Sequence, residues 1–354
     1  GTGLVSVEVS TNGRDFSSGG AQYEFVSVSV SSLMPWSGPA LGGTVVTIGG
    51  SGLATDVDAL RCRFGGDGTV WASVHGGVGV RCVTPVSSAN GWVSVELLSH
   101  AEVLQSGSSF YVHAQMWVSA VLPSSGPVLG GTRLAVSGAG FRESATLRCR
   151  MVEAGATTVA RIVSASQLEC ASPASSGAGV RHVEVSMNGQ QFSSSGVEYT
   201  YRVAAAVSSV WPVRGAAEGG TPVTVLGSGF SSSAEALGEL WCRFNATAAR
   251  AAYVSDSAAV CNTTQSGTGL VSVEVSTNGR DFSSGGAQYE YVSVTVSSLA
   301  PWSGPLLGGT VVTVGGSGLT VDVEALRCRF GGDGTVWASV HGGVGVRCVT
   351  PVRT

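Results

Sequence analysis

The sequence contains no lysine, so arginine and a few histidines carry all of its positively charged side chains. The 19 arginines are outnumbered by 23 acidic residues, which gives a formal net charge of -4. A nucleic-acid-binding surface needs clustered cations to neutralise phosphate groups, and this composition offers no broad surface of that kind. We therefore expect no nucleic-acid partner.

Long apolar runs are absent as well. No stretch reaches the roughly 18 consecutive apolar residues of a spanning helix, so we expect no membrane insertion by this segment. Charged residues make up only 12% of the chain and hydrophobic residues 43%, a balance typical of folded domains and opposite to that of disordered chains. The opening Gly1-Thr2-Gly3-Leu4 is neither a signal peptide nor a natural translation start, so we expect a fragment or a processed product.

Catalytic and metal-binding patterns are also missing. The chain has no Gly-x-Ser-x-Gly elbow, and no set of serine, histidine and aspartate recurs in a form that suggests catalysis. A single histidine or aspartate in a glycine-rich turn is more often a loop residue than a ligand, and no oxygen-rich calcium set is visible. This interpretation applies to His75, His341, Asp67, Asp333, Asp56 and Asp58. The sequence thus predicts no enzyme, no metal and no cofactor.

Glycine, by contrast, is abundant, with 52 residues, and it marks a repeat. The segment 38–53, GPALGGTVVTIGGSGL, returns in related form at 126–141, 215–230 and 304–319, with spacings of 88, 89 and 89 residues. Apolar residues alternate with others between the glycines, which is typical of a β-strand between turns. A repeat of this length predicts four small β-domains in tandem.

The repeats divide the chain with almost no linker between domains. We predict a first domain over 28–113, a second over 117–202 and a third over 205–292. Residues 1–27, called here the N-terminal segment, contain only the last part of such a domain. Residues 293–354, the fourth domain, contain only the first part of one.

A longer period is superimposed on the single repeats. Residues 1–86 match residues 267–352 at all but eight positions, which defines a 266-residue unit of three different domains. One interpretation is that the chain is a window on a longer array of such triplets. The other is that the terminal strands of one molecule complete the open last domain of the next by strand addition.

Each domain copy contains one pair of cysteines about twenty residues apart. This spacing does not match the close doublets of zinc sites, and histidines do not accompany the pairs. Disulfides are therefore predicted, each stabilising its domain by roughly 3 kcal/mol in the chain-entropy model. Buried free thiols in a cytosolic protein are the less favoured alternative. The pairs are Cys62 and Cys82, Cys149 and Cys170, Cys242 and Cys261, and Cys328 and Cys348.

The repeated motif resembles a known family. Pro35-Trp36-Ser37-Gly38-Pro39, followed by LGGTVVTI and GSGL, is similar to the IPT/TIG domain, an immunoglobulin-like β-sandwich of plexins, growth-factor receptors, some transcription factors and microbial surface proteins. The resemblance covers essentially the whole chain, although the third copy departs from it at residues 212–218. It implies an all-β extended array of tandem immunoglobulin-like sandwiches with one disulfide per domain. The basic loops of the DNA-binding members are absent, so the resemblance implies an extracellular or cell-surface protein.

Two further kinds of site are predicted. Asn245-Ala246-Thr247 and Asn262-Thr263-Thr264 are N-glycosylation sequons in the third domain. Trp36, Trp211 and Trp302 lie beside the opening proline of their domains. We expect these tryptophans to pack at domain junctions, with stacking on a sugar ring as the alternative.

These features together favour a structural role. The leading hypothesis is a self-associating subunit of an extracellular filament or cell-surface fibre built from three-domain units, of which mastigoneme-like hairs are one instance. The alternative is an adhesin stalk or receptor ectodomain that presents a ligand-binding region outside this window, with other surface proteins or glycans as partners. A third hypothesis, a carbohydrate-binding accessory module, requires a catalytic domain elsewhere.

Overall fold

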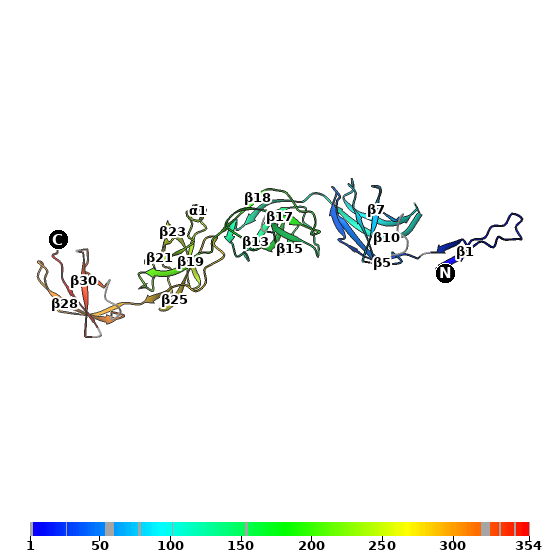
Figure 1. The fold of residues 1–354 in the computed structure, drawn as a ribbon. Helices are drawn as coiled ribbons and strands as arrows, with labels where there is room; N and C mark the ends of the chain where they lie inside the picture. The colour runs from blue at the N-terminus through cyan, green and yellow to red at the C-terminus, as the bar shows by residue number, and fades with distance from the viewer. Residues whose placement is uncertain are drawn as a thin grey trace. The chain divides into compact units, whose positions relative to one another are not determined.

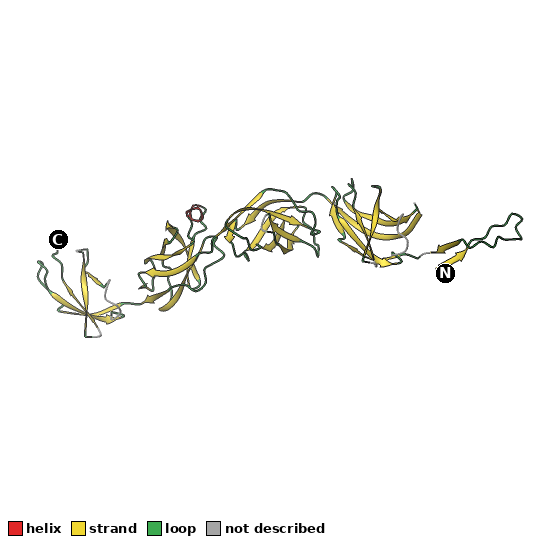
Figure 2. Cartoon of the chain, in the orientation of Figure 1, coloured by secondary structure: helices red, strands yellow, loops and turns green. Residues whose placement is uncertain are grey.

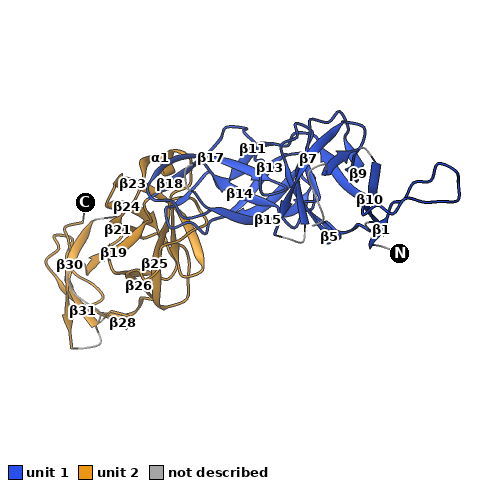
Figure 3. Ribbon diagram, turned by 45° about the vertical axis from the view of Figure 1, so that its right-hand side comes forward, with its two compact units in different colours: residues 1–202 blue, residues 203–354 orange. Residues whose placement is uncertain are grey.

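The computed structural model describes residues 3–25, 27–53, 60–76, 79–100, 102–152, 155–319, 326–332, 334–342 and 345–353. These residues form two compact units, 1–202 and 203–354 (Figure 3). Strands dominate both units, and the helix assigned within the described residues is the short α1, Ser232–Ala236 (Figure 2). The all-β prediction is therefore confirmed.

The first three domains share one strand order. In each of them the strands form one continuous sheet that curves into a barrel-like sandwich (Figure 1). In the first domain this order is β3 (Ser29–Met34), β5 (Val45–Ser51), β8 (Gly79–Val83), β7 (Thr69–His75), β6 (Leu60–Phe64), β9 (Gly91–Ser99), β10 (Glu102–His113) and β4 (Ser37–Pro39). In the second domain it is β11 (Trp117–Leu122), β13 (Arg133–Ala139), β16 (Gln167–Ala171), β15 (Thr157–Ser164), β14 (Arg148–Met151), β17 (Gly179–Ser186), β18 (Val197–Arg202) and β12 (Ser125–Pro127).

The second unit begins with the third domain, which repeats the same topology. Its order is β19 (Ala206–Trp211), β21 (Pro222–Ser228), β24 (Ala258–Asn262), β23 (Thr247–Ser255), β22 (Trp241–Phe244), β25 (Gly269–Ser276), β26 (Gln288–Val292) and β20 (Arg214–Ala216). The fourth domain contributes a five-stranded sheet of β27 (Thr295–Ala300), β28 (Val311–Ser317), β31 (Gly345–Val349), β30 (Thr335–His341) and β29 (Arg327–Arg329). The N-terminal segment is a hairpin of β1 (Gly3–Ser6) and β2 (Gln22–Phe25).

The Gly-Gly-Thr motif of each repeat joins two parts of its sandwich. Gly42 and Gly43 adopt φ of 74° and 78°, in the left-handed region that residues with a Cβ atom rarely adopt. The backbone N–H of Thr44 then donates to the hydroxyl oxygen of Thr84, at 3.0 Å, just after the second cysteine strand. Equivalent bonds form at residues 132 and 172, 221 and 263, and 310 and 350, so the two motifs recur together because they bind each other.

The same sequence is buried or exposed according to its neighbours. In the third domain Tyr289 is completely buried and lies opposite Val271, on the strand pair β25 and β26. The corresponding Tyr23 and Val5 of the N-terminal hairpin keep the same register but are exposed. Local pairing is thus set by the residues of the hairpin, whereas burial requires the first half of a sandwich.

Candidate functional site

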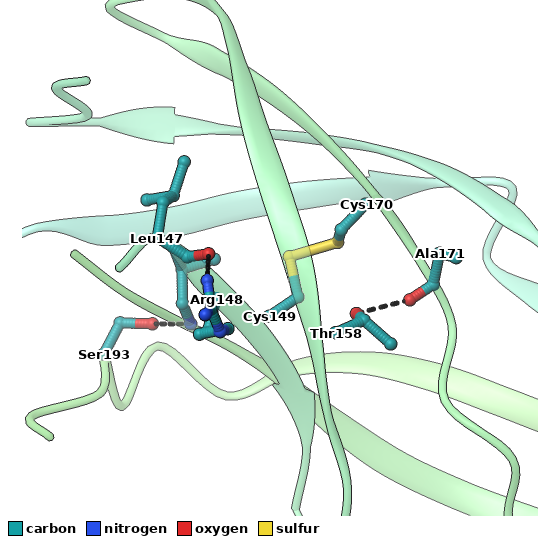
Figure 4. Close-up of a disulfide and its surroundings, with 8 residues drawn as sticks. Leu147, Arg148, Cys149, Thr158, Cys170, Ala171 and Ser193 are labelled. Atoms are coloured by element: carbon teal, nitrogen blue, oxygen red, sulfur yellow. Dashed lines mark hydrogen bonds between the residues drawn. A yellow bond between two sulfur atoms is a disulfide. The ribbon is translucent and has the colours of Figure 1, made fainter. Parts of the chain in front are cut away.

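The four cysteine pairs are disulfides in the structure; seven of the eight cysteines are buried in the cores, and Cys328 is partly buried against the core of the fourth domain. Each bridge joins the strand that carries Arg-Cys-Arg or Trp-Cys-Arg to the strand that precedes the Thr or Ser-containing turn, with sequence separations of 19 to 21 residues. The bridge between Cys149 on β14 and Cys170 on β16 is drawn in Figure 4. Thr158 lies beside it, and its hydroxyl donates to the carbonyl oxygen of Ala171 at 2.6 Å. Among the described cysteines none is free. Because such bridges persist in oxidising compartments, they agree with an extracellular location.

A polar, hydrogen-bonded turn in the second domain, residues 186–193, is a candidate interaction site within the first unit. Asn188 shapes this turn, since its Oδ1 accepts hydrogen bonds from the backbone N–H groups of Gln190 and Gln191, both at 3.0 Å. Gly189 occupies the left-handed region at φ 74°, and its N–H donates to Ser186 Oγ at 2.8 Å. The Asn-Gly sequence therefore forms a closed turn that directs both glutamines away from their own sheet.

An arginine below the turn supports it from one side. Arg150 Nε donates to Glu184 Oε2 at 2.7 Å, and its guanidinium lies 3.9 Å from the ring centroid of Phe192. The third domain repeats this arrangement with Arg243, Glu274 and Phe282, at 4.1 Å from the guanidinium to the ring. A charged pair that is held against an aromatic ring has few accessible side-chain conformations, so it fixes the base of the turn.

The turn binds the first domain through its two glutamine side chains. The side-chain amide of Gln190 pairs with the backbone of Val45 as a neighbouring strand would. Its Oε1 accepts from Val45 N–H and its Nε2 donates to the carbonyl oxygen of Val45, both at 2.8 Å. Gln191 Nε2 donates to the carbonyl oxygen of Gly43 at 2.9 Å, and its Oε1 accepts from Thr44 Oγ1 at 2.9 Å. We call this set of contacts the glutamine clamp. It joins the second domain to the Gly-Gly-Thr turn of the first.

A small cavity of about 260 Å³ lies beside the clamp, lined by residues that include His113, Met116, Leu41 and Gln191. His113 is only 3% exposed, and its Nδ1 donates to the carbonyl oxygen of Ala114 at 3.0 Å. Burial lowers the pKa of His113, the backbone hydrogen bond opposes this shift, and the nearby Arg142 charge adds to it. The buried Nε2 atom has no hydrogen-bond partner among the described residues. A lone neutral imidazole without a nucleophile or a second ligand offers no evident chemistry.

An aromatic cluster occupies the outer surface of the first domain. Trp36 stacks on Trp92 with 5.6 Å between ring centroids, and Trp92 meets the edge of Tyr111 at 5.3 Å. Arg142 of the second domain lies 4.8 Å from the Tyr111 ring centroid. The sequence prediction included Trp36 but missed Trp92 and Tyr111. The signal that could have found them is the presence of an aromatic residue at an outward position on both β9 and β10.

The three predicted junction tryptophans differ in their surroundings. Trp36 is partly buried against Trp92, whereas the side chains of Trp211 and Trp302 are 69% and 86% exposed within the second unit. Packing of these residues at domain junctions stays a prediction.

Both predicted sequons present their asparagines on the surface of the third domain. Asn245 lies in the two-residue turn between β22 and β23, where it adopts a left-handed φ of 57°, and Asn262 is exposed at the end of β24. Thr247 is exposed as well, while the Oγ1 atom of Thr264 is buried. Glycosylation at these two positions stays a prediction.

The loop residues considered as ligands remain apart. His75 and His341 are exposed at the ends of β7 and β30, and Asp67 accepts a hydrogen bond from Ser87 Oγ. Asp56, Asp58 and Asp333 lie outside the described residues. In the described part of the chain no three His, Cys, Asp or Glu residues come close enough to hold a metal ion. A search of the same residues finds no helix with the length and apolar character needed to cross a membrane.

Comparison with known proteins identifies the repeated unit. The family model for the IPT/TIG domain matches residues 28–112, 117–201, 205–291 and 294–354. Plexin-2 of Caenorhabditis briggsae is 26% identical over 209 residues, which are 56% of this chain and 11% of that protein. Human Fibrocystin-L is 36% identical over 118 residues, or 32% of this chain and 3% of that protein. The chain thus spans about a tenth or less of these relatives.

The solved structures that match include the full extracellular region of Plexin A4, at 16% identity and a TM-score of 0.37 over 92% of this chain and 34% of that one. The disulfides and the sequence relatives together indicate an extracellular or cell-surface protein. Family-model matches to four successive segments cover most of the sequence and confirm the predicted resemblance. The chain belongs to the IPT/TIG domain family.

Proposed function

We propose that this chain is a stalk segment of a cell-surface or secreted ectodomain, which holds a ligand-binding region that lies outside it. The glutamine clamp is the observation that carries this proposal. A stalk has to keep successive domains in a defined relation, and four side-chain hydrogen bonds from Gln190 and Gln191 do this within the first unit. The chain's partners are then other surface proteins or glycans.

The relatives favour this role over a filament subunit, which was the leading sequence-based hypothesis. Plexins are the relatives that match more than half of this chain, and the matching Plexin A4 structure is described as an extracellular region. A non-catalytic role agrees with the relatives and with the polar, hydrogen-bonded character of the clamp.

The clamp makes the stalk hypothesis testable through one amide. Val45 N–H donates to Gln190 Oε1, so its hydrogen exchange reports directly on docking of the second domain. In the full chain, Gln190→Ala together with Gln191→Ala should accelerate exchange at Val45 about fivefold or more, the effect of losing ~1 kcal/mol of hydrogen bonding. Gln265→Ala, an exposed glutamine of the third domain, is the matched control and should leave this rate unchanged.

Light scattering of the same protein separates the two functional hypotheses. A stalk segment is expected to remain monomeric at micromolar concentration, with no growth of larger species on incubation. Regular filaments seen by electron microscopy of the unmodified chain would overturn the stalk proposal and restore the filament hypothesis. Unchanged exchange at Val45 in the double variant would show that the clamp does not hold the domains.

A further inference from the structure

The aromatic cluster of Trp36, Trp92 and Tyr111 is an outward-facing surface built from three neighbouring segments. Trp92 on β9 and Tyr111 on β10 are direct cross-strand partners. Trp36 precedes β4, and its carbonyl oxygen accepts a hydrogen bond from Tyr111 N–H at 2.9 Å. The ladder therefore places the three rings side by side at one edge of the first domain. Trp92 is 63% exposed in this arrangement.

The fold itself does not require aromatic residues at these positions. The second domain has Ser124, Val180 and Thr200 at the corresponding places, since Val180 pairs with Thr200 as Trp92 pairs with Tyr111. The third domain has Val213, Leu270 and Glu290 there, with Leu270 opposite Glu290. All three sandwiches share one topology, so the exposed rings of the first domain are not a requirement of packing. A contiguous cluster of exposed rings leaves apolar surface in contact with water, which favours a partner that covers it.

An uncompensated positive charge lies next to the rings. The guanidinium of Arg142 stacks over Tyr111 and is exposed, and it belongs to none of the ion pairs among the described residues. By contrast, Arg63, on β6 of the first domain, is neutralised by Glu96. A flat aromatic surface beside a free guanidinium is complementary to a ligand that has both an apolar face and a negative charge.

We propose that this cluster binds an acidic saccharide. One pyranose ring lies with its C–H face on Trp92, because the slightly positive C–H groups meet the negative face of the indole ring. The carboxylate of a hexuronic or sialic acid then accepts a charge-assisted hydrogen bond from Arg142. The site goes beyond the stalk role, since it gives the first domain a ligand of its own. It occurs in the first domain and not in the second or third.

The test uses the full chain and an immobilised panel of hexuronic-acid and sialic-acid oligosaccharides, each with its neutral counterpart. At least one acidic oligosaccharide should bind saturably, and about tenfold more tightly than its neutral counterpart. Trp92→Ala should lower affinity about tenfold, as expected for loss of an aromatic stack. Arg142→Gln should reduce binding of the acidic form to the level of the neutral form.

Trp71→Ala provides the matched control. Trp71 belongs to the same domain and is 62% exposed, but it lies on β7 and stacks with Arg61 at 3.9 Å. This variant should bind like the unmodified chain. The proposal is overturned if no acidic oligosaccharide of the panel binds, if neutral forms bind equally well, or if Trp71→Ala weakens binding as much as Trp92→Ala. Saturable binding of a proline-rich peptide to Trp92, with no saccharide binding, would overturn it in favour of a protein partner.

Discussion

Strands β10 and β18 occupy the same place in two sandwiches and use their aromatic residues in opposite ways. Both pair with the preceding long strand and with a short parallel strand from the Ser-Gly-Pro motif. In β18 the inward residues are Tyr199 and Tyr201, and the outward one is Thr200. In β10 a phenylalanine and a valine face inward, while Tyr111 faces outward. Burial alternates in the same way over residues 110–112 and 199–201, so the fold tolerates either placement.

The inward tyrosines of the second domain are part of its core. Their rings meet edge to face with 5.0 Å between centroids, and the hydroxyl of Tyr201 donates to the carbonyl oxygen of Pro173 at 2.6 Å. Gly126 leaves room for the hydroxyl of Tyr199, since a Cβ atom there would collide with it and with Thr132. In the first domain Phe110 approaches the corresponding Gly38, without a hydroxyl. The second domain thus uses its aromatic residues for stability, and the first leaves part of them at the surface.

The largest expected effect comes from truncating one aromatic residue in each strand. Tyr199→Ala removes a fully buried ring and should lower the free energy of unfolding of the second domain by about 3–5 kcal/mol. Tyr111→Ala removes a partly exposed ring and should cost the first domain less than about 1 kcal/mol. Hydrogen exchange of peptides from β17 and β9 reports on each domain separately. Equal losses in the two variants would contradict the comparison.

Disulfide removal should show where the two domains do not differ. The bridges close segments of nearly equal length, with separations of 20 and 21 residues, and both lie in the core. Cys62→Ala with Cys82→Ala, and Cys149→Ala with Cys170→Ala, should each lower the unfolding free energy by about 3 kcal/mol. Denaturant titrations monitored by domain-specific hydrogen exchange would measure both. A difference much larger than ~1 kcal/mol between domains would show that packing around the bridge, and not loop closure, dominates.

The sequence was sufficient to predict the class of fold, the cysteine pairs and the family. These features depend on local patterns: glycines at the turns, alternation in the strands, and a nearly constant spacing between Cys149 and Cys170 and their equivalents. Each pattern is repeated, so every copy supports the others. The fold-class and family predictions were confirmed for that reason.

The glutamine clamp and the aromatic cluster were not predictable in this way. Gln190 and Val45 lie 145 residues apart, and nothing in either local sequence indicates the other. Asn188-Gly189 predicts a turn, but the same Asn-Gly at residue 278 is followed by arginine and aspartate, where the asparagine amide instead donates to Asp281 at 2.7 Å. Trp92 and Tyr111 become neighbours only through the register of β9 and β10. Long-range pairing and strand register therefore set the limit of prediction.

The smallest expected effect is a pH dependence of docking between the first and second domains, at the junction beside β10. Burial lowers the pKa of His113, so the docked junction holds this imidazole neutral, whereas an opened junction lets it titrate near its ordinary value of 6.5. Protons then bind the opened state more readily, and docking should be fully favourable above pH 6.5 and weaken progressively as the pH falls below it. A charge on His113 would also be repelled by Arg142, which lowers the pKa of His113 in the docked state further.

The protection factor of the Val45 amide, corrected for the intrinsic exchange rate, should fall between pH 7.5 and pH 5 in the unmodified chain and stay constant in His113→Gln. An equal fall in both proteins would assign the pH dependence to other groups.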